Sequence, residues 1–317
     1  MSTFAKAGFK SANYNSFRPH YPPSFYKILT EYIGKEAGKT GDKVGKTIDL
    51  GCGTGVATYP LLQFSQNVVG LDLSPPMIET ANSLKAAKLK ELGIQDESRI
   101  EFGVCAVEDF DAPPNSYDLI TAAECIHWFK DYPKFFEAAA KHLKPNGVLA
   151  YWFYVDPVVV NFEGPHNEKL LAIETMRRAQ QIYLLYVYED PKGLGVHWDR
   201  PGRDILRNLL REVDAQIPQD LFKDVKTQKY VPSVDGLLQL TPQDLRLVRE
   251  KITLKDFTNY ISTYSLFHNY SESTGAGAEF LEKMIQEFET ELGWDREKTL
   301  LDLNWTSGYT FMRKSGE

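Results

Sequence analysis

Glycines that alternate with other residues after an aspartate form the stretch best suited to ligand chemistry. The stretch Thr47–Gly55 reads Thr-Ile-Asp-Leu-Gly-Cys-Gly-Thr-Gly. Glycine lets a loop turn tightly and lets a ligand approach the backbone closely. A dinucleotide-binding loop would need its third glycine at position 56, which is Val56. The acidic Asp49 suits a ligand with a cationic amino group better than one with a pyrophosphate. The alternative is a strand-turn-helix whose glycines serve packing alone.

Two further strand ends complete a candidate cofactor site. Asp72 closes the second predicted strand, where a carboxylate can accept hydrogen bonds from ribose hydroxyls. The third predicted strand ends at Cys105–Glu108, where an adenine ring would lie. S-adenosylmethionine combines an adenosine with an amino group and no phosphate, so we predict it as the cofactor and S-adenosylhomocysteine as its product. The predicted cofactor-binding residues in these strands and loops are Asp49, Gly51, Cys52, Gly53, Asp72, Leu73, Met77, Ala106 and Val107.

A group that can do acid–base chemistry follows the fourth predicted strand. Glu124, His127 and Trp128 lie at the edge where ligands meet such sheets. His127 is either a general base or a neutral donor that shapes a pocket. A carboxylate acceptor is already ionised at pH 7 and needs no base. Trp128 either faces a cationic sulfonium with its ring or packs in the core.

Arginines offer the positive charge that an anionic acceptor needs. Arg203 and Arg207 share a face if their segment is helical. Arg18 can orient a carboxylate of cofactor or substrate with its bidentate fork. A solvated helix face is the alternative for the later arginines, and the aromatics of 260–270 either roof the pocket or pack a lid. The predicted substrate-binding residues are Arg18, His127, Trp128, Trp198, Arg200, Arg203 and Arg207.

Alternating strands and helices must position these side chains. Five strand–helix repeats before residue 155 predict an α/β fold with a parallel, doubly wound sheet. The predicted strands are 47–50, 67–73, 100–104, 117–123, 148–154, 224–230 and 300–312, and the predicted helices include 56–64, 75–92, 133–143 and 203–213. We divide the chain into an arm and helix (1–34), a cofactor-binding core (35–156) and a remainder (157–317) that holds the final core elements and two lid insertions, about 157–200 and 231–290.

The amino-acid composition restricts the kinds of partner and the compartment that we expect for this protein. The 317 residues carry 36 basic and 43 acidic side chains, a net charge of −7, which argues against nucleic acid. No apolar run approaches the ~20 residues of a membrane span. The three widely spaced cysteines fit reduced thiols, so we expect a cytoplasmic protein without a metal site. We expect a small-molecule carboxylic acid as substrate, and monomer and dimer both stay open.

Motifs along the chain resemble class I methyltransferases and, more narrowly, the trans-aconitate methyltransferase family and the related fungal cantharidin-detoxifying enzyme. These motifs are Tyr14–Pro22, Ile48–Gly55, Glu124–Phe129, Trp198–Arg203, Tyr260–His268 and Asn304–Thr306. The resemblance implies a seven-stranded Rossmann-like sheet, a helical lid, S-adenosylmethionine as methyl donor and esterification of a small acid. It also implies an arm that closes over the cofactor, which adds Tyr14 and Tyr21 to the predicted cofactor contacts. In the family the first residues after the fourth strand border the methionine part of the cofactor, which adds Glu124. Ala106 departs from the family, where an Asp is common.

Other functions remain open from the sequence. The acceptor can be a hydroxyl, a thiol or the carboxylate of a toxin, in which case His127 gains importance as a base. A non-catalytic protein that binds S-adenosylmethionine is a second class. A nicotinamide oxidoreductase is disfavoured by the glycine spacing and by Asp49.

Overall fold

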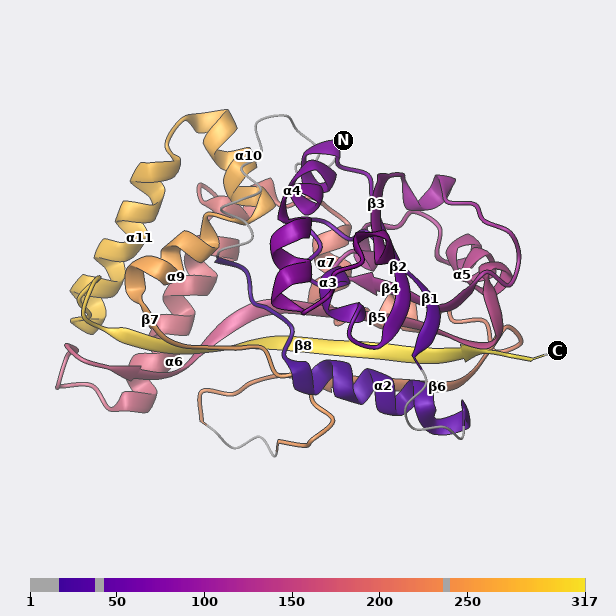
Figure 1. The fold of residues 1–317 in the computed structure, drawn as a ribbon. Coiled ribbons are helices and arrows are strands. Elements are labelled where there is room, and N and C mark those ends of the chain that lie inside the picture. The colour runs from indigo at the N-terminus through magenta and orange to yellow at the C-terminus, as the bar shows by residue number, and fades with distance from the viewer. Residues whose placement is uncertain (1–16, 38–42, 236–239, 317) are drawn as a thin grey trace.

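The computed structural model describes residues 17–37, 43–235 and 240–316. Within these ranges, one sheet of eight strands has the order β3-β2-β1-β4-β5-β8-β6, and β7 also pairs with β8 (Figure 1). The strands from β3 to β5 are parallel, and β8 is antiparallel to its three partners. The strands are β1 (Val44–Leu50), β2 (Ser65–Asp72), β3 (Ile100–Val104), β4 (Tyr117–Ala123), β5 (Leu143–Glu163), β6 (Phe222–Tyr230), β7 (Val248–Thr253) and β8 (Leu300–Lys314). The predicted α/β fold is confirmed.

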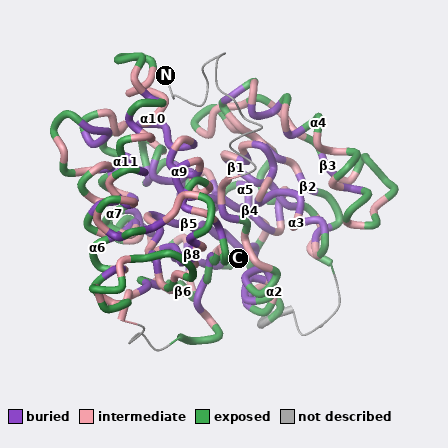
Figure 2. Tube along the Cα trace, turned by 90° about the vertical axis from the view of Figure 1, so that its left-hand side faces the viewer, coloured by how far each residue is buried: buried purple, intermediate pink, exposed green. Residues whose placement is uncertain are grey.

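Helices cover both faces of the sheet. The longer ones are α2 (Pro23–Ala37), α4 (Pro75–Glu91), α5 (Tyr132–His142), α6 (Ala172–Leu184), α9 (Leu254–Ile261), α10 (Ser265–Thr274) and α11 (Gly277–Leu292), and the short ones are α3 (Thr58–Leu61), α7 (Gly202–Arg207) and α8 (Arg211–Asp214). Apolar side chains of α2, α3 and α4 pack on one face, and those of α5, α7 and α8 pack on the other. Both faces of the central strands are therefore buried, which explains their long apolar runs (Figure 2).

Local signals set the helix that follows β2. Ser74 caps α4 by accepting a hydrogen bond from the Met77 backbone N–H, and proline occupies the first turn, where it is tolerated. The predicted helix 56–64 is only the short α3. The chain turns early into β2, because the Phe64 carbonyl accepts a hydrogen bond from Val44.

The lid helices pack on an extension of the central sheet and do not form a separate unit beside it. β5 extends well past the predicted end at 154 because its residues up to Glu163 continue to pair with β8. β7, an eighth strand inside the predicted insertion 231–290, adds to this extension. The helices α6, α9, α10 and α11 gather on it, at the left of Figure 1. One apolar cluster includes Trp152 from the sheet and Phe257 and Phe288 from the lid, so lid and sheet share a core.

The predicted helix 203–213 is broken in two. Leu209 and Leu210 both have φ of 57°, so they leave the right-handed helix between α7 and α8. Leu210 is fully buried beside Leu206 and Val213. Burial of these three leucine and valine side chains against the sheet therefore outweighs continuous helix. None of the helices in the described part of the chain is both long and apolar enough to cross a bilayer.

Candidate active site

The glycine loop follows β1, as predicted, and its glycines have different tasks. Gly51, Gly53 and Gly55 all have positive φ (69°, 54° and 86°). A methyl group at Gly51 would lie 2.6 Å from Cβ of Cys125, and one at Gly55 would lie 2.7 Å from the Tyr59 ring. A methyl group at Gly53 would meet no atom within 4 Å in the described structure. Gly53 therefore faces open space, while the other two allow close packing. The Cys52 side chain between them is buried.

Asp49 is buried beneath the glycine loop, away from the open space that Gly53 faces. The residue is fully buried, and its two carboxylate oxygens accept hydrogen bonds from Thr58 Oγ1 (2.6 Å) and Thr121 Oγ1 (2.7 Å). Burial raises the pKa of Asp49 to about 6, against the lowering effect of both threonine hydroxyls. This geometry does not support the predicted direct contact between Asp49 and an amino group. Asp49 instead ties β1 to α3 and β4 beneath the loop.

The ends of β2 and β3 meet beside Gly53. Asp72 Oδ2 accepts from the Gly53 N–H and Oδ1 from the Ser74 N–H, both at 2.8 Å, and burial raises its pKa. The Cys105 N–H donates to the Asp72 carbonyl at 2.9 Å. Leu73 is 53% exposed although it is large and apolar.

The remaining predicted cofactor contacts divide into two groups. Ala106 and Val107 are partly exposed at the end of β3, whereas Met77 is buried. An open glycine, a carboxylate and an apolar rim fit an adenosine, so these residues suit S-adenosylmethionine, while Met77 does not reach the surface of the site.

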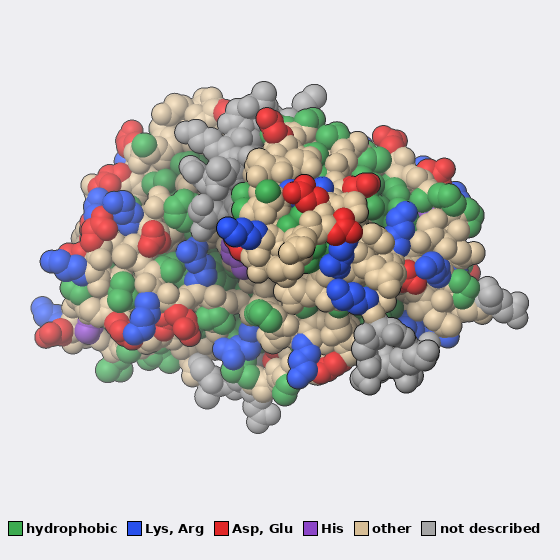
Figure 3. Space-filling model, in the orientation of Figure 1, with side chains coloured by type: hydrophobic (Ala, Val, Ile, Leu, Met, Phe, Trp, Pro, Cys, Tyr) green, Lys and Arg blue, Asp and Glu red, His purple; other side chains and the backbone are tan. Residues whose placement is uncertain are grey.

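A cavity of about 50 Å³ is lined by side chains from the arm, the core and the lid. The residues that line it are Arg18, Glu124, His127, Trp128, Val155, Trp198, Arg203, Leu206, Tyr264 and Ser265. Five of the seven predicted substrate-binding residues are among them. We call the space that these residues line the acceptor cavity. Figure 3 shows one face of the molecule, with a hollow where a histidine lies beside Lys or Arg side chains.

Two predicted arginines do not line the acceptor cavity. The Arg200 side chain is 65% exposed and pairs with Asp204 at 3.1 Å, so it follows the solvated alternative. Arg207 is half exposed, and its Nε lies 3.9 Å from Asp156 Oδ2. Arg203 and Arg207 do approach one partner from one helix face, as their spacing predicts. Of the three predicted arginines, only Arg203 lines the described cavity.

Arg203 and Asp156 form a buried ion pair at the cavity wall. Arg203 is only 7% exposed, and its Nη2 donates to Asp156 Oδ1 at 2.7 Å. Its guanidinium lies 4.0 Å from the centre of the Trp198 ring. Burial opposes its charge, but Tyr188 and Asp156 together raise its pKa. Arg203 is therefore a permanent cation inside the protein.

Glu124 and His127 line the same cavity with shifted protonation. Glu124 Oε2 accepts from the Tyr154 N–H at 2.8 Å, and burial raises its pKa to about 7, against the lowering effects of that hydrogen bond, Arg18 and Arg203. His127 is 4% exposed, and burial followed by the charge of Arg203 lowers its pKa to about 3. His127 is thus neutral at pH 7 and a weak base. Its Nδ1 has no hydrogen-bond partner among the described residues.

Trp128 is positioned by the first glycine of α7. A methyl group at Gly202 would lie 2.5 Å from the Trp128 ring, so only glycine lets α7 pack this closely. Trp128 remains partly exposed toward the acceptor cavity. The fit explains why a glycine precedes Arg203 and favours a pocket role for Trp128 over the core alternative.

The arm joins the site through Arg18. Its Nη1 donates to Tyr154 Oη (3.2 Å) and its Nη2 to the Thr263 carbonyl (3.0 Å). Its guanidinium also lies over the rings of Tyr260 and Tyr264. Arg18 therefore connects β5 with the lid at the cavity wall. Tyr21, predicted to contact the cofactor, packs edge-on against Trp152, 5.7 Å between ring centres. Tyr14 lies outside the described residues.

Asp156 is the most important residue that the sequence prediction missed. It follows the apolar run of β5, at the same sheet edge as Glu124, and that position was the available signal. The sequence indicates Tyr264 only as one of several aromatics of 260–270 that roof the pocket or pack a lid. Val155, Leu206 and Ser265 carry no signal of their own in the sequence.

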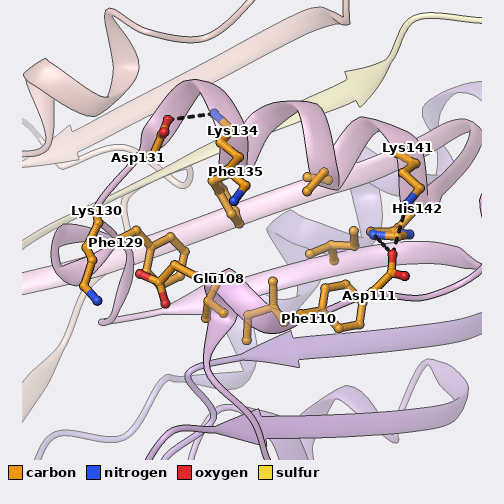
Figure 4. Close-up of a pocket in the computed structure, with 15 residues that line it drawn as sticks. Glu108, Phe110, Asp111, Phe129, Lys130, Asp131, Lys134, Phe135, Lys141 and His142 are labelled. Carbon is orange, nitrogen blue, oxygen red and sulfur yellow. Dashed lines mark hydrogen bonds and ion pairs between the residues drawn. The ribbon is translucent and has the colours of Figure 1, made fainter.

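A larger cavity, of about 140 Å³, lies between α5 and the loop after β3 (Figure 4). Phe110, Phe129 and Phe135 line it, and Lys141 pairs with the exposed Asp111 at its rim at 2.9 Å. Its walls are mainly apolar, and its charged groups are exposed. The buried titratable side chains Arg203 and His127 line the smaller acceptor cavity instead, so we place the chemistry there.

Comparisons with known proteins concern the fold and the cofactor-binding part of the chain. Residues 48–151 match the methyltransferase domain family. A protein of Saccharomyces cerevisiae named as a probable S-adenosylmethionine-dependent methyltransferase is 25% identical over 99% of this chain and 98% of its own. The trans-aconitate 2-methyltransferase of Deinococcus radiodurans is 35% identical, but over only 33% of this chain and 36% of its own. A solved structure from Anaeromyxobacter dehalogenans, assigned to the type II methyltransferases, covers 95% of this chain and is itself covered completely, with a TM-score of 0.61 and 19% identity, which shows the fold.

The residues covered by these matches support the methyltransferase domain but do not identify its acceptor. The family match spans β1 to β5, which hold the glycine loop and Asp72. The match to the trans-aconitate enzyme is partial, so it does not identify the acceptor. The fold, the glycine loop and the family match together make residues 48–151 a class I methyltransferase domain that uses S-adenosylmethionine.

Proposed function

We propose that the chain transfers the methyl group of S-adenosylmethionine to a carboxylate of a small organic acid, with trans-aconitate as the first candidate. The observation that carries the proposal is Arg203, a buried cation at the wall of a cavity next to the cofactor-binding edge. Arg18 adds a second guanidinium to the same wall. A buried guanidinium suits the planar, bidentate geometry of a carboxylate.

Alignment and charge neutralisation are the main tasks of the protein in this reaction. Gly53, Asp72, Leu73, Ala106 and Val107 would hold S-adenosylmethionine, which supplies a methyl group already activated by its sulfonium. Arg203 and Arg18 would orient the acceptor so that one carboxylate oxygen faces the methyl carbon in line. Holding two reactants in this way lowers a barrier by ~7–11 kcal/mol.

Proton transfer is not needed for a carboxylate acceptor. The acceptor is ionised at pH 7, and the lowered pKa of His127 keeps that residue neutral. His127 would therefore act as a hydrogen-bonding wall, not as a base. Trp198 and Tyr264 from the lid would exclude water from the reacting atoms.

The number of carboxylates on the acceptor is open to test. Only two guanidinium groups line the described cavity, and Glu124 lies beside them. An acid with three carboxylates would bring excess negative charge toward Glu124. Mono- and dicarboxylic acids therefore belong in the same screen as trans-aconitate.

A hydroxyl acceptor is the second candidate, and Glu124 favours it. A general base works best with a pKa near the working pH, and the pKa of Glu124 is raised to about 7. Glu124 could take the proton of a hydroxyl as the methyl bond forms. In this case Glu124, and not His127, is the base.

Mass spectrometry of products separates the two candidates. The enzyme is incubated with S-adenosylmethionine and a panel that contains trans-aconitate, simpler carboxylic acids and hydroxylated compounds. A base-labile product one methylene heavier supports carboxylate esterification, and a base-stable one from a hydroxyl compound supports an ether. For the true acceptor, Arg203→Lys should raise the acceptor KM far more than the cofactor KM. Equal rises in both would refute the role of Arg203 in acceptor binding.

A further inference from the structure

Asp156 is a meeting point of donors from three elements. Its Oδ1 accepts from Tyr183 Oη (2.6 Å), Tyr188 Oη (2.7 Å) and Arg203 Nη2 (2.7 Å). The tyrosines come from α6 and the π-helical turn after it, Leu185–Glu189, and the arginine comes from α7. Two tyrosines of the lid and the arginine of α7 thus converge on one carboxylate of β5.

A bulge in β5 presents this carboxylate. Tyr154 pairs with Ser307 and Pro157 pairs with Trp305, so two residues of β5 stand opposite one residue of β8. Asp156 is one of these two. Bulges re-aim side chains and occur often beside active sites. Glu124, which lines the acceptor cavity, bonds to the backbone of Tyr154 at the start of the same bulge.

The Arg203 side chain is fixed in its plane and incompletely bonded. Trp198 and Tyr188 lie near its guanidinium, at 4.0 and 5.4 Å from their ring centres. Nη2 is occupied by Asp156 and also donates to Tyr188 Oη. Nε is buried and has no partner among the described residues. A buried donor on a charged group is costly unless something accepts from it, and Arg203 lines the acceptor cavity.

We infer that Asp156 is a positioning residue that holds Arg203 so that its Nε donates to one oxygen of the acceptor carboxylate. The inference rests on the proposed function and assigns Arg203 a single hydrogen bond through Nε in place of a bidentate fork, because Asp156 already takes Nη2. Tyr183 and Tyr188 fix the carboxylate of Asp156, and Trp198 keeps the guanidinium plane from rotating.

A merely structural role for Asp156 would look different in an experiment. Asp214 provides the matched control, because it is a partly buried aspartate that accepts from Tyr151 Oη (2.7 Å), Lys229 Nζ (2.7 Å) and Thr310 Oγ1 (3.0 Å). It does not line the acceptor cavity. Asp156→Asn and Asp214→Asn both weaken a tyrosine- and cation-bonded carboxylate, but only the first should affect the acceptor.

Kinetics test the inference with the acid found to be methylated. Asp156→Asn should raise the acceptor KM at least ~10-fold, the scale of one misaligned charge-assisted hydrogen bond, and leave the dissociation constant of S-adenosylhomocysteine within about 2-fold. Asp156→Glu should recover part of the acceptor KM, and Asp214→Asn should not change it. Equal acceptor KM values for Asp156→Asn and Asp214→Asn would overturn the inference.

A binding measurement keeps the inference testable without turnover. The Nε–H resonance of Arg203 is assigned in arginine-labelled protein saturated with S-adenosylhomocysteine, by its loss in Arg203→Lys. Trans-aconitate, benzoate and propionate are then added as probes. A shift in the native protein that needs ~10-fold more probe in Asp156→Asn supports the inference, even if no acid is methylated and the proposed function fails. Methylation of an acid that leaves this resonance unmoved would refute the inference and keep the proposed function.

Discussion

Replacing Gly53 by alanine tests whether the open side of the glycine loop is the cofactor side. Gly53 has φ of 54° and no atom within 4 Å of an added methyl group. The change therefore costs the folded protein only the left-handed conformation, ~1–2 kcal/mol. With cofactor bound, the methyl group would occupy ligand space and cost a further ~1–3 kcal/mol, which weakens binding ~5- to 150-fold.

Gly93→Ala is the control that isolates the ligand effect. Gly93, just after α4, has φ of 68° and also no atom within 4 Å of an added methyl group. It should lose the same ~1–2 kcal/mol of stability and keep its affinity for the cofactor. Gly51→Ala should lose more, because its methyl group would collide with Cys125 at 2.6 Å, adding ~1–3 kcal/mol.

Two measurements on the same three variants test whether the cofactor lies over Gly53. Urea unfolding without cofactor gives the stability order, and calorimetric titration with S-adenosylhomocysteine gives the affinity. If Gly53→Ala binds S-adenosylhomocysteine as tightly as Gly93→Ala does, the cofactor does not lie over Gly53, and the assignment of this loop face is refuted.

Two further predictions concern stability. Tyr260→Phe removes the acceptor of the buried Trp305 Nε1–H (2.8 Å) and should cost ~1–3 kcal/mol in urea unfolding; a loss below about 0.5 kcal/mol would contradict the need for this bond. The pKa of Glu124 rises on folding from 4.5 to about 7, so the folded state keeps a proton that the unfolded state has released, and the stability from this group is lost as pH rises through about 7. Glu124→Gln should flatten this loss, on the order of 2–3 kcal/mol between pH 4.5 and 8.5, and identical slopes for both proteins would show that Glu124 does not titrate as described.

The parts of the fold that local sequence controls could be predicted. Parallel strands that are buried on both faces carry apolar runs in the sequence. The glycine loop carries glycines at the positions where its backbone must turn tightly. These features located β1 to β5 and the cofactor edge. Helix 203–213 failed because the tertiary burial of Leu210 overrides helix periodicity, and periodicity was the only available signal.

The sequence could indicate several residues that line the acceptor cavity, but not which partners their side chains bond to. His127, Trp128 and Arg203 line this cavity, and each could be singled out because it follows a strand end or belongs to a recognisable block. Whether an arginine meets a ligand, solvent or an internal carboxylate depends on distant partners. Asp156 lies 47 residues before Arg203 in the chain, and no local pattern relates the two.

The pairing of β5 with β8 also constrains how the polypeptide folds during synthesis. β8 lies between β5 and β6 in the sheet and, through β7, also forms the floor of the lid. Its partner β5 leaves the ribosome well over a hundred residues earlier. Until Leu300–Lys314 emerges, β5 is an open edge with a long apolar run, which invites pairing with other chains. Such non-local pairing is slow, so the edge of β5 should stay open to pairing with other chains until β8 is inserted.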